Sequence, residues 1–379
     1  MSQSGNSRRG SSITDLRMTL LTGFAFVLVI ILVTSCIVYF APKAPTSVIS
    51  GSSTNCAADS PYGFTTIHAD AQLVGAYKQL GVCWVRYQYH WGQQKSHPGI
   101  EVDTGVYNWG PVDAAIAAMN AANIHVDFAI QYAPEWRLSQ VCKGVVFLPG
   151  PDDMAQFAKI IATRYDGKHG HGRIDAFEIG NEEYDSFFIK SDPSSIQCRT
   201  ANYYGPVLKA GYQAIKAVNP HVLVGMFGMW YQNLQHVKDF MTYLYAHGYG
   251  KYMDYMNYHY YTYNDPAVAV GNQPSFDQWW QTMHEIATKY GFSEKPIWVT
   301  EVGWPTTFGF NVTQVVTPEV QAQRLQYIMD EAQKSHIIKR VFWFTINYGK
   351  QSDNIDPPSG PLPAFYMLQQ IVRQRPVWS

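Results

Sequence analysis

Two short apolar stretches indicate the fold of this chain. Residues 174–183 read Ile-Asp-Ala-Phe-Glu-Ile-Gly-Asn-Glu-Glu, a β-rich run that ends abruptly at Asn181 and Glu182. Residues 296–305 read Pro-Ile-Trp-Val-Thr-Glu-Val-Gly-Trp-Pro and end in the same way at Glu301. Short apolar runs between turn residues are typical of buried strands. We therefore predict two buried strands, each with a carboxylate at its C-terminal end.

Similar runs alternate with helix-length amphipathic segments along the chain from residue 61 onward. Eight strand–helix alternations predict an α/β fold, specifically a (β/α)8 (TIM) barrel. No G-x-G-x-x-G or Walker pattern occurs, which argues against dinucleotide and P-loop sites. The predicted strands are 62–67, 82–88, 124–131, 174–181, 222–228, 255–261, 297–301 and 340–346. The predicted helices are 69–80, 111–122, 151–165, 200–218, 232–248, 275–290, 317–335 and 362–373.

In such a barrel, active sites form at the C-terminal ends of the strands. Glu182 and Glu301 would then project from the fourth and seventh strands on opposite sides of one cleft. Glycoside hydrolysis needs this pair, because one carboxylic acid protonates the leaving oxygen while one carboxylate attacks the anomeric carbon. A single glutamate at a strand end is more often a salt bridge or a cap. Two at matching positions favour a glycosidase.

The two motifs together resemble the retaining glycoside hydrolases of clan A, over residues 61–375. Gly180-Asn-Glu and Glu301-Val-Gly-Trp-Pro are similar to family 17 β-glucanases, whereas Phe177-Glu-Ile-x-Asn-Glu and Trp84-Val-Arg are similar to families 39 and 5. The resemblance implies that Glu182 is the general acid/base and Glu301 the nucleophile. Many relatives have proline after the acid/base, and here Glu183 stands in its place.

The resemblance also implies roles for substrate-binding residues. Asn181 would bond the sugar 2-OH, provided that strand geometry breaks near Gly180, because neighbouring strand residues otherwise point to opposite faces. Tyr261 would orient the nucleophile, and Trp343 would be the platform beneath the reacting sugar. The other predicted substrate-binding residues are Arg86, expected to pair with Glu301, together with His259, Trp136 and Trp304.

Other ionisable residues have simpler interpretations. Glu178 is expected to be structural, and His169 and His171 to lie in a solvated loop. We predict no metal and no cofactor, because the sequence suggests no cluster of His and Asp ligands at the strand ends. The alternative to a glycosidase is a non-catalytic carbohydrate-binding protein on the same barrel.

The overall charge suggests a neutral ligand. The chain has 379 residues, with 28 Lys+Arg against 29 Asp+Glu. A net charge of -1 without a basic run argues against nucleic acid as a partner. Aromatic residues make up 15%, which suits an oligosaccharide or polysaccharide because sugar C–H faces stack on rings. A monomer is expected.

The N-terminal region predicts a membrane anchor. Residues 18–40 form a run of 23 without a charge, and about 20 such residues span a bilayer. Arg8, Arg9 and Arg17 precede it, which predicts residues 1–17 in the cytoplasm and the catalytic domain outside. A lipoprotein with Cys36 as its modified N-terminus and a cleaved signal peptide remain as alternatives.

Residues 41–58, rich in Pro, Ser, Thr and Gly, are predicted to be a linker, followed by a catalytic domain over residues 59–379. An extracytoplasmic domain would lie in an oxidising compartment, where disulfides form. We expect Cys83 to be a small buried hydrophobe in a strand. Cys142 and Cys198 could form a disulfide, which would leave Cys56 over.

Overall fold

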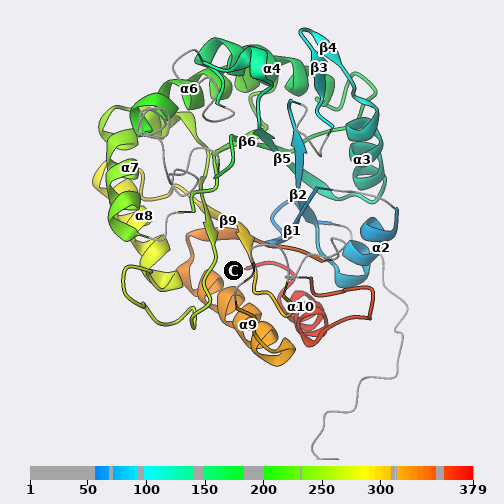
Figure 1. Cartoon of the computed structure of the whole chain (residues 1–379), viewed down its shortest axis with the longest axis vertical. Coiled ribbons are helices and arrows are strands. Elements are labelled where there is room, and N and C mark those ends of the chain that lie inside the picture. Colours follow the sequence, from blue (N-terminus) through cyan, green and yellow to red (C-terminus); the bar gives the residue numbers. More distant parts are fainter. Residues whose placement is uncertain are drawn as a thin grey trace, which may run out of the picture. The chain divides into compact units, whose positions relative to one another are not determined.

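Eight parallel strands form one sheet in the computed structural model (Figure 1). The structure describes residues 56–67, 71–92, 98–139, 148–182, 200–230, 233–308, 312, 314–346 and 354–378. The strands lie in the order β7-β6-β5-β2-β1-β10-β9-β8. Their bounds are β1 (Tyr62–Thr66), β2 (Trp84–His90), β5 (His125–Gln131), β6 (Ala176–Ile179), β7 (Leu223–Met226), β8 (Met256–Tyr260), β9 (Ile297–Val302) and β10 (Ile338–Trp343).

The two ends of this sheet meet. Isolated parallel bridges join Gly225 to Tyr255 and Met229 to Tyr258, between β7 and β8, so that the sheet forms a nearly closed barrel. Helices surround the barrel in Figure 1, one after each strand. The helices are α2 (Ala71–Leu80), α3 (Gly110–Ala121), α4 (Pro151–Arg164), α6 (Ala201–Val218), α7 (Leu234–Ala246), α8 (Phe276–Lys289), α9 (Pro318–Ser335) and α10 (Pro363–Gln374). This order confirms the predicted (β/α)8 barrel and its eight strand–helix alternations.

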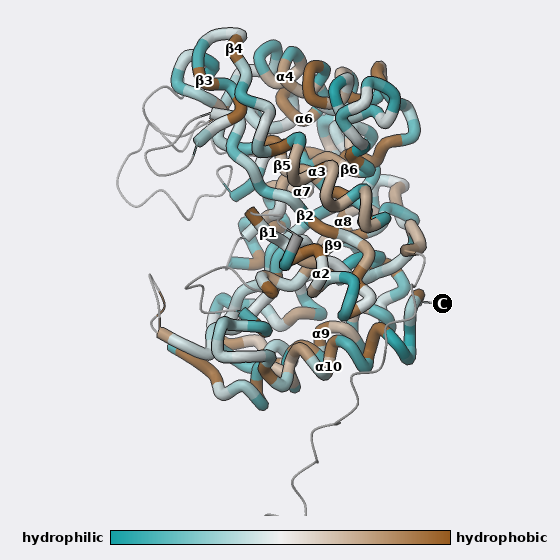
Figure 2. Tube along the Cα trace, turned by 90° about the vertical axis from the view of Figure 1, so that its right-hand side faces the viewer, coloured by the Kyte–Doolittle hydropathy of each residue, from teal (hydrophilic) through white to brown (hydrophobic). Residues whose placement is uncertain are grey.

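Local sequence signals explain where the helices begin. Pro151, Pro318 and Pro363 each occupy the first helical turn, where a missing N–H costs nothing. Ser275 and Gln278 form a reciprocal capping box at the start of α8. In Figure 2, α9 and α10 alternate between hydrophobic and hydrophilic segments, as expected for helices with one face on the barrel.

The strands form the core. All seven residues of β5 and all six of β9 are buried, because each strand has one face inside the barrel and the other beneath helices. A small antiparallel pair, β3 (Glu101–Asp103) and β4 (Val106–Tyr107), was not predicted. It is too short for a period-two pattern to be recognised, and Gly105 forms its turn with a positive φ of 72°.

One disulfide differs from the prediction. Cys56 bonds to Cys83, so Cys83 is not a free buried thiol and Cys56 is not left over. The sequence could not indicate this pairing, because residues after a linker have no predicted position. The carbonyl of Ala58 accepts hydrogen bonds from Trp84 and Arg340, which also hold this segment against the barrel. Cys142 and Cys198 lie outside the described residues.

The predicted cytoplasmic tail and membrane segment, residues 1–17 and 18–40, also lie outside the described residues, as does nearly all of the linker. Among the helices that the structure describes, none is both long enough and apolar enough to span a bilayer.

Candidate active site

The end of β6 changes direction at Gly180. The strand stops at Ile179, and Gly180 has a φ of +94°, a conformation that side chains with a Cβ rarely adopt. The predicted break in strand geometry is therefore present. As a result, the consecutive residues Asn181 and Glu182 both reach toward the centre of the barrel mouth, where each contacts residues of other strands.

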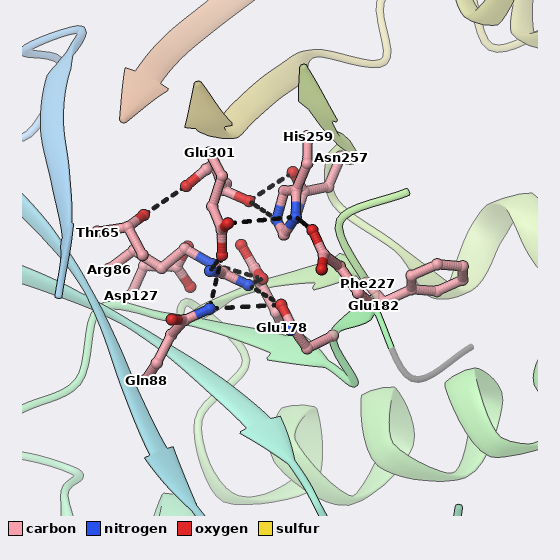
Figure 3. A network of polar contacts seen from close by, with 12 residues as sticks. Thr65, Arg86, Gln88, Asp127, Glu178, Glu182, Phe227, Asn257, His259 and Glu301 are labelled. Atoms are coloured by element: carbon pink, nitrogen blue, oxygen red, sulfur yellow. Dashed lines mark hydrogen bonds and ion pairs between the residues drawn. The ribbon is translucent and has the colours of Figure 1, made fainter. Parts of the chain in front are cut away.

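Glu301, at the end of β9, is held by three donors. Its Oε1 accepts hydrogen bonds from Arg86 Nη1 and Gln88 Nε2, each at 2.7 Å. Its Oε2 accepts one from the Tyr261 hydroxyl at 2.8 Å. Figure 3 shows Arg86 and Gln88 approaching Glu301 from β2. Three donors around one carboxylate stabilise its negative charge and fix its direction. The predicted contacts of Arg86 and Tyr261 with Glu301 are thus observed.

Glu182 has a very different environment. Its side chain is 15% exposed, and Oε1 lies 2.6 Å from Nδ1 of His259. Burial raises the pKa of this carboxyl to about 7, although the positive charge of Arg86 opposes the rise. Glu182 therefore holds a proton at mildly acidic pH, where an ordinary glutamate is ionised.

His259 is buried on β8 and neutral. Burial lowers its pKa to about 4, against the raising effect of the Glu301 charge. Only 1% of its surface is exposed, so it contacts Glu182 rather than a ligand. The prediction of His259 as a substrate-binding residue is wrong in this respect, because the neighbouring side chains cover it.

Arg86 is the centre of a buried ion-pair network below the cleft. It is fully buried and contacts Glu178 at 2.7 Å as well as Glu301. Burial alone would lower the pKa of Arg86, but the two carboxylates reverse this and raise it. Arg86 therefore positions the nucleophile candidate and does not reach substrate, which corrects the prediction that it binds sugar. Glu178 is structural, as predicted.

Asp127, on β5, completes the base of this network. Burial raises the pKa of Asp127 well above its usual range, and the nearby charge of Glu178 adds to the rise. The Tyr255 hydroxyl donates to Asp127 Oδ1 at 3.2 Å. Asp127 therefore favours its neutral form more than an ordinary aspartate does.

The two candidate catalytic carboxylates are close together. An oxygen of Glu182, an oxygen of Glu301 and a nitrogen of His259 all lie within 4.8 Å of one another. Such a group has the composition of a cation site. However, ligand atoms on a tetrahedral zinc lie about 3.4 Å apart when each bond is about 2.1 Å, and Glu182 and His259 are separated by only 2.6 Å. That distance is typical of a hydrogen bond. The group is therefore better described as a hydrogen-bonded pair of Glu182 and His259 beside the carboxylate of Glu301.

A cavity of about 550 Å³ opens above the two carboxylates, which is within the usual size range of small-ligand sites. Its aromatic lining includes Trp230, Tyr261, Tyr263 and Phe344. Rings of this kind offer the apolar faces on which sugars stack.

The structure overturns two predicted aromatic contacts. Trp343 and Trp304 have 0% exposure and their ring centroids lie 5.8 Å apart, so neither presents a face to a ligand. The prediction chose Trp343 because of its residue type, whereas the neighbouring Phe344 lies one residue beyond β10 and lines the cavity. Trp136 is 43% exposed and is not among the cavity residues; its role stays a prediction. His169 is 60% exposed and pairs with Asp166, as expected for a solvated loop.

Sequence reasoning missed Gln88, Trp230 and Phe344. Gln88 has a usable signal, because it lies two residues after Arg86 and therefore on the same face of β2. Trp230 follows β7 at the end where active sites form, which is a weaker signal. Phe344 has no sequence signal other than its position in the chain.

Comparisons with known proteins agree with this geometry. Residues 190–357 match the family described as "Glycosyl hydrolase catalytic core", which includes Glu301 but not Glu182 and covers less than half of the chain. No curated protein matches the sequence.

Several solved structures share the fold. A family 39 glycoside hydrolase from Bacteroides cellulosilyticus WH2 has a TM-score of 0.61 and 18% identity, over 83% of this chain and 64% of that one. A glucosidase from Croceicoccus marinus has a TM-score of 0.59 and 16% identity, over 83% and 67%. The intracellular xylanase TsXylA from Thermoanaerobacterium saccharolyticum has a TM-score of 0.56 and 13% identity, over 85% and 99%.

The chain thus spans less than two thirds of the family 39 enzyme. At these identities the solved structures establish the shared barrel alone. The family match adds chemistry to that fold. The family match supports an O-glycoside hydrolase, and the barrel is one that several solved glycoside hydrolases share.

Proposed function

We propose that this protein is a retaining β-glycosidase that hydrolyses O-glycosidic bonds of an oligosaccharide or polysaccharide by double displacement. One observation carries the proposal: two carboxylates within 4.8 Å of each other lie in opposite electrostatic environments. Burial raises the pKa of Glu182 to about 7, whereas Arg86, Gln88 and Tyr261 donate to Glu301. An environment that favours the protonated form marks Glu182 as the acid, and an environment rich in donors marks Glu301 as the nucleophile.

In the first step, Glu301 attacks the anomeric carbon. Glu182 gives its proton to the glycosidic oxygen as the bond between that oxygen and the anomeric carbon breaks. The sugar is then bonded to Glu301 as a glycosyl-enzyme. Hydrogen bonds from Arg86, Gln88 and Tyr261 hold Glu301 in one direction, so little reorganisation is needed when it reacts.

In the second step, Glu182 is ionised and acts as the base. It removes a proton from a water molecule that attacks the anomeric carbon, and the bond to Glu301 breaks. An oxygen of Glu182 lies within 4.8 Å of an oxygen of Glu301, which supports this course. Retaining enzymes have them about 5–5.5 Å apart, and inverting enzymes about 6.5–9.5 Å, to leave room for water.

The substrate follows from the cavity. Its wall combines aromatic faces with the polar side chains of Thr262 and Gln273. This combination suits a neutral sugar better than a charged or wholly apolar ligand. The β-configuration is proposed from the resemblance of the two sequence motifs. The mechanism needs no metal and no organic cofactor.

The test is the stereochemistry of hydrolysis. The purified full chain would be incubated with β-1,3- and β-1,4-glucans, xylan, galactan and aryl β-glycosides, and the anomer formed first would be identified by proton NMR. We expect the β-anomer from at least one substrate, and no product from the Glu301→Gln variant. An α-anomer would contradict the retaining course. Sugar binding without hydrolysis would favour the carbohydrate-binding alternative.

We also propose that residues 18–40 anchor the chain in a membrane with the barrel outside the cytoplasm. The uncharged run of 23 residues after Arg8, Arg9 and Arg17 supports this topology. The Cys56–Cys83 disulfide supports an oxidising compartment.

The topology can be tested in cells that express the full chain. We expect the protein to stay in the membrane fraction at alkaline pH, and a protease added to intact cells to degrade the barrel. The Cys36→Ala variant should behave in the same way. Loss of that variant from the membrane would indicate a lipoprotein, and release of the unmodified chain would contradict the anchor.

A further inference from the structure

A chain of buried polar groups lies behind the acid/base candidate. Thr300 Oγ1 lies 2.8 Å from Asn257 Oδ1 and 3.1 Å from His259 Nε2. His259 Nδ1 then lies 2.6 Å from Glu182 Oε1. Asn257 and Thr300 have 0% exposure, so water does not compete for these groups. Figure 3 shows Asn257 and His259 side by side on β8, with Glu182 facing the ring.

A bulge in β9 brings Thr300 into this chain. Tyr258 pairs with Val299, but the next residue, His259, pairs with Glu301, so Thr300 is an extra residue on β9. The pairing of β9 with β10 is shifted in the same stretch. In a regular strand Thr300 and Glu301 would point to opposite faces. A bulge re-aims side chains, and here both reach the barrel interior.

Counting hydrogens fixes the direction of each bond. Asn257 Nδ2 donates to the carbonyl of Met226 at 3.4 Å, which turns Asn257 Oδ1, an acceptor, toward Thr300. The single hydroxyl hydrogen of Thr300 therefore goes to Asn257. Thr300 Oγ1 must then accept from His259, and Nε2 of His259 carries the N–H.

The protonation of Nε2 determines that of the other ring nitrogen, Nδ1. A neutral imidazole has one N–H, so Nδ1 of His259 is a bare acceptor. Because burial favours the neutral form of His259, the hydrogen in the 2.6 Å contact with Nδ1 comes from Glu182, which is then a carboxylic acid. The charged and titratable groups that face this pair are Arg86, Glu178, Glu301 and the Tyr261 hydroxyl.

We infer that Asn257 and Thr300 are positioning residues which fix His259 in its Nε2–H form. In the resting site, Nδ1 of His259 then accepts a hydrogen bond from the carboxylic acid of Glu182. The inference rests on the proposed function for its role in turnover, but not for the tautomer itself. Once Glu182 has given up its proton, its carboxylate faces the lone pair of Nδ1. This repulsion makes Glu182 a stronger base for the water of the second step.

The packing around the ring of His259 restricts its orientation. A Cβ at Gly228 would overlap the His259 ring at Nε2, so a glycine is needed for the ring to occupy this position. The backbone N–H of His259 donates to Met229 at 2.9 Å, which ties β8 to the segment that follows β7. The ring therefore has little freedom to turn away from Thr300.

Nitrogen NMR of the full chain labelled with ¹⁵N-histidine tests the tautomer without any need for turnover. The His259 signals would be assigned by their loss in His259→Gln. We expect Nε2 to carry the proton and Nδ1 to be unprotonated at neutral pH. In Thr300→Val, which keeps the shape but removes the acceptor, this preference should disappear, whereas Thr300→Ser should retain it. A protonated Nδ1 in the unmodified protein would overturn the inference, whether or not the chain hydrolyses glycosides.

Kinetics with two leaving groups test the role in acid catalysis. For an aryl glycoside with a poor leaving group, which needs the acid, we expect Thr300→Val to lower kcat/KM about tenfold, as for the loss of one buried hydrogen bond. For a dinitrophenyl glycoside, which does not need the acid, kcat/KM should stay near that of the unmodified enzyme. Thr300→Ser should match the unmodified enzyme with both substrates. Equal losses with both substrates, or a serine variant as impaired as the valine variant, would overturn the role.

Discussion

Replacing Glu301 by glutamine should abolish turnover, with a loss of kcat/KM on the order of 10⁴–10⁶-fold, as is typical when a covalent nucleophile is removed. The amide has the size of the carboxylate but cannot form the glycosyl-enzyme. The fold should survive, because Arg86 keeps its buried partner Glu178 at 2.7 Å. Affinity for a sugar product, measured by calorimetry, should therefore change little.

A second measurement identifies the nucleophile directly. A 2-deoxy-2-fluoro glycoside with a good leaving group should accumulate as a covalent intermediate, because fluorine destabilises the oxocarbenium-like transition states of both steps. Mass spectrometry of the digested protein should find the label on the peptide that contains Glu301, and no label in the Glu301→Gln variant. A label on another carboxylate, or activity retained by the variant, would contradict the assignment of Glu301.

The barrel could be predicted from the sequence because its strands are buried on both faces. Runs such as residues 124–131 are mostly apolar and lie between turn residues, so they stand out from the amphipathic helices. The β3–β4 pair and the Cys56–Cys83 bond could not be predicted in this way. Both depend on where segments without a periodic pattern lie in space.

The site was predictable where residues lie within the strands or shortly after them. Glu182 lies three residues after the end of β6, Glu301 is the penultimate residue of β9, and the period of two places Arg86 beside Gln88 on β2. Residue type alone was misleading for tryptophan. Trp343 is within β10 and buried, whereas Phe344, one residue further, lines the cavity. The bulge at Thr300 has no sequence signal, and it determines which residues stand behind the acid.

The second large effect concerns Glu182. Without the acid, Glu182→Gln should lower kcat/KM about 10²–10⁴-fold for substrates with poor leaving groups, the usual contribution of general acid catalysis. Activated aryl glycosides should be much less affected in the first step, because their leaving group departs without a proton. The glycosyl-enzyme should then persist, because no base activates water. The pattern of losses across leaving groups is therefore the measurement that identifies Glu182 as the acid.

The pH dependence gives an independent check with a definite sign. Glu182 must be protonated in the free enzyme, and burial raises its pKa to about 7. The activity measured as kcat/KM should accordingly fall as the pH rises through about 7, and Glu182→Gln should lack this basic limb. The same shift affects stability. Between pH 4.5, the ordinary pKa of glutamate, and about 7, the folded protein holds a proton that the unfolded chain releases, so stability falls with rising pH. Glu182→Gln should remove this slope in urea unfolding measured across that range. An unchanged basic limb in the variant would show that another group carries the acid proton.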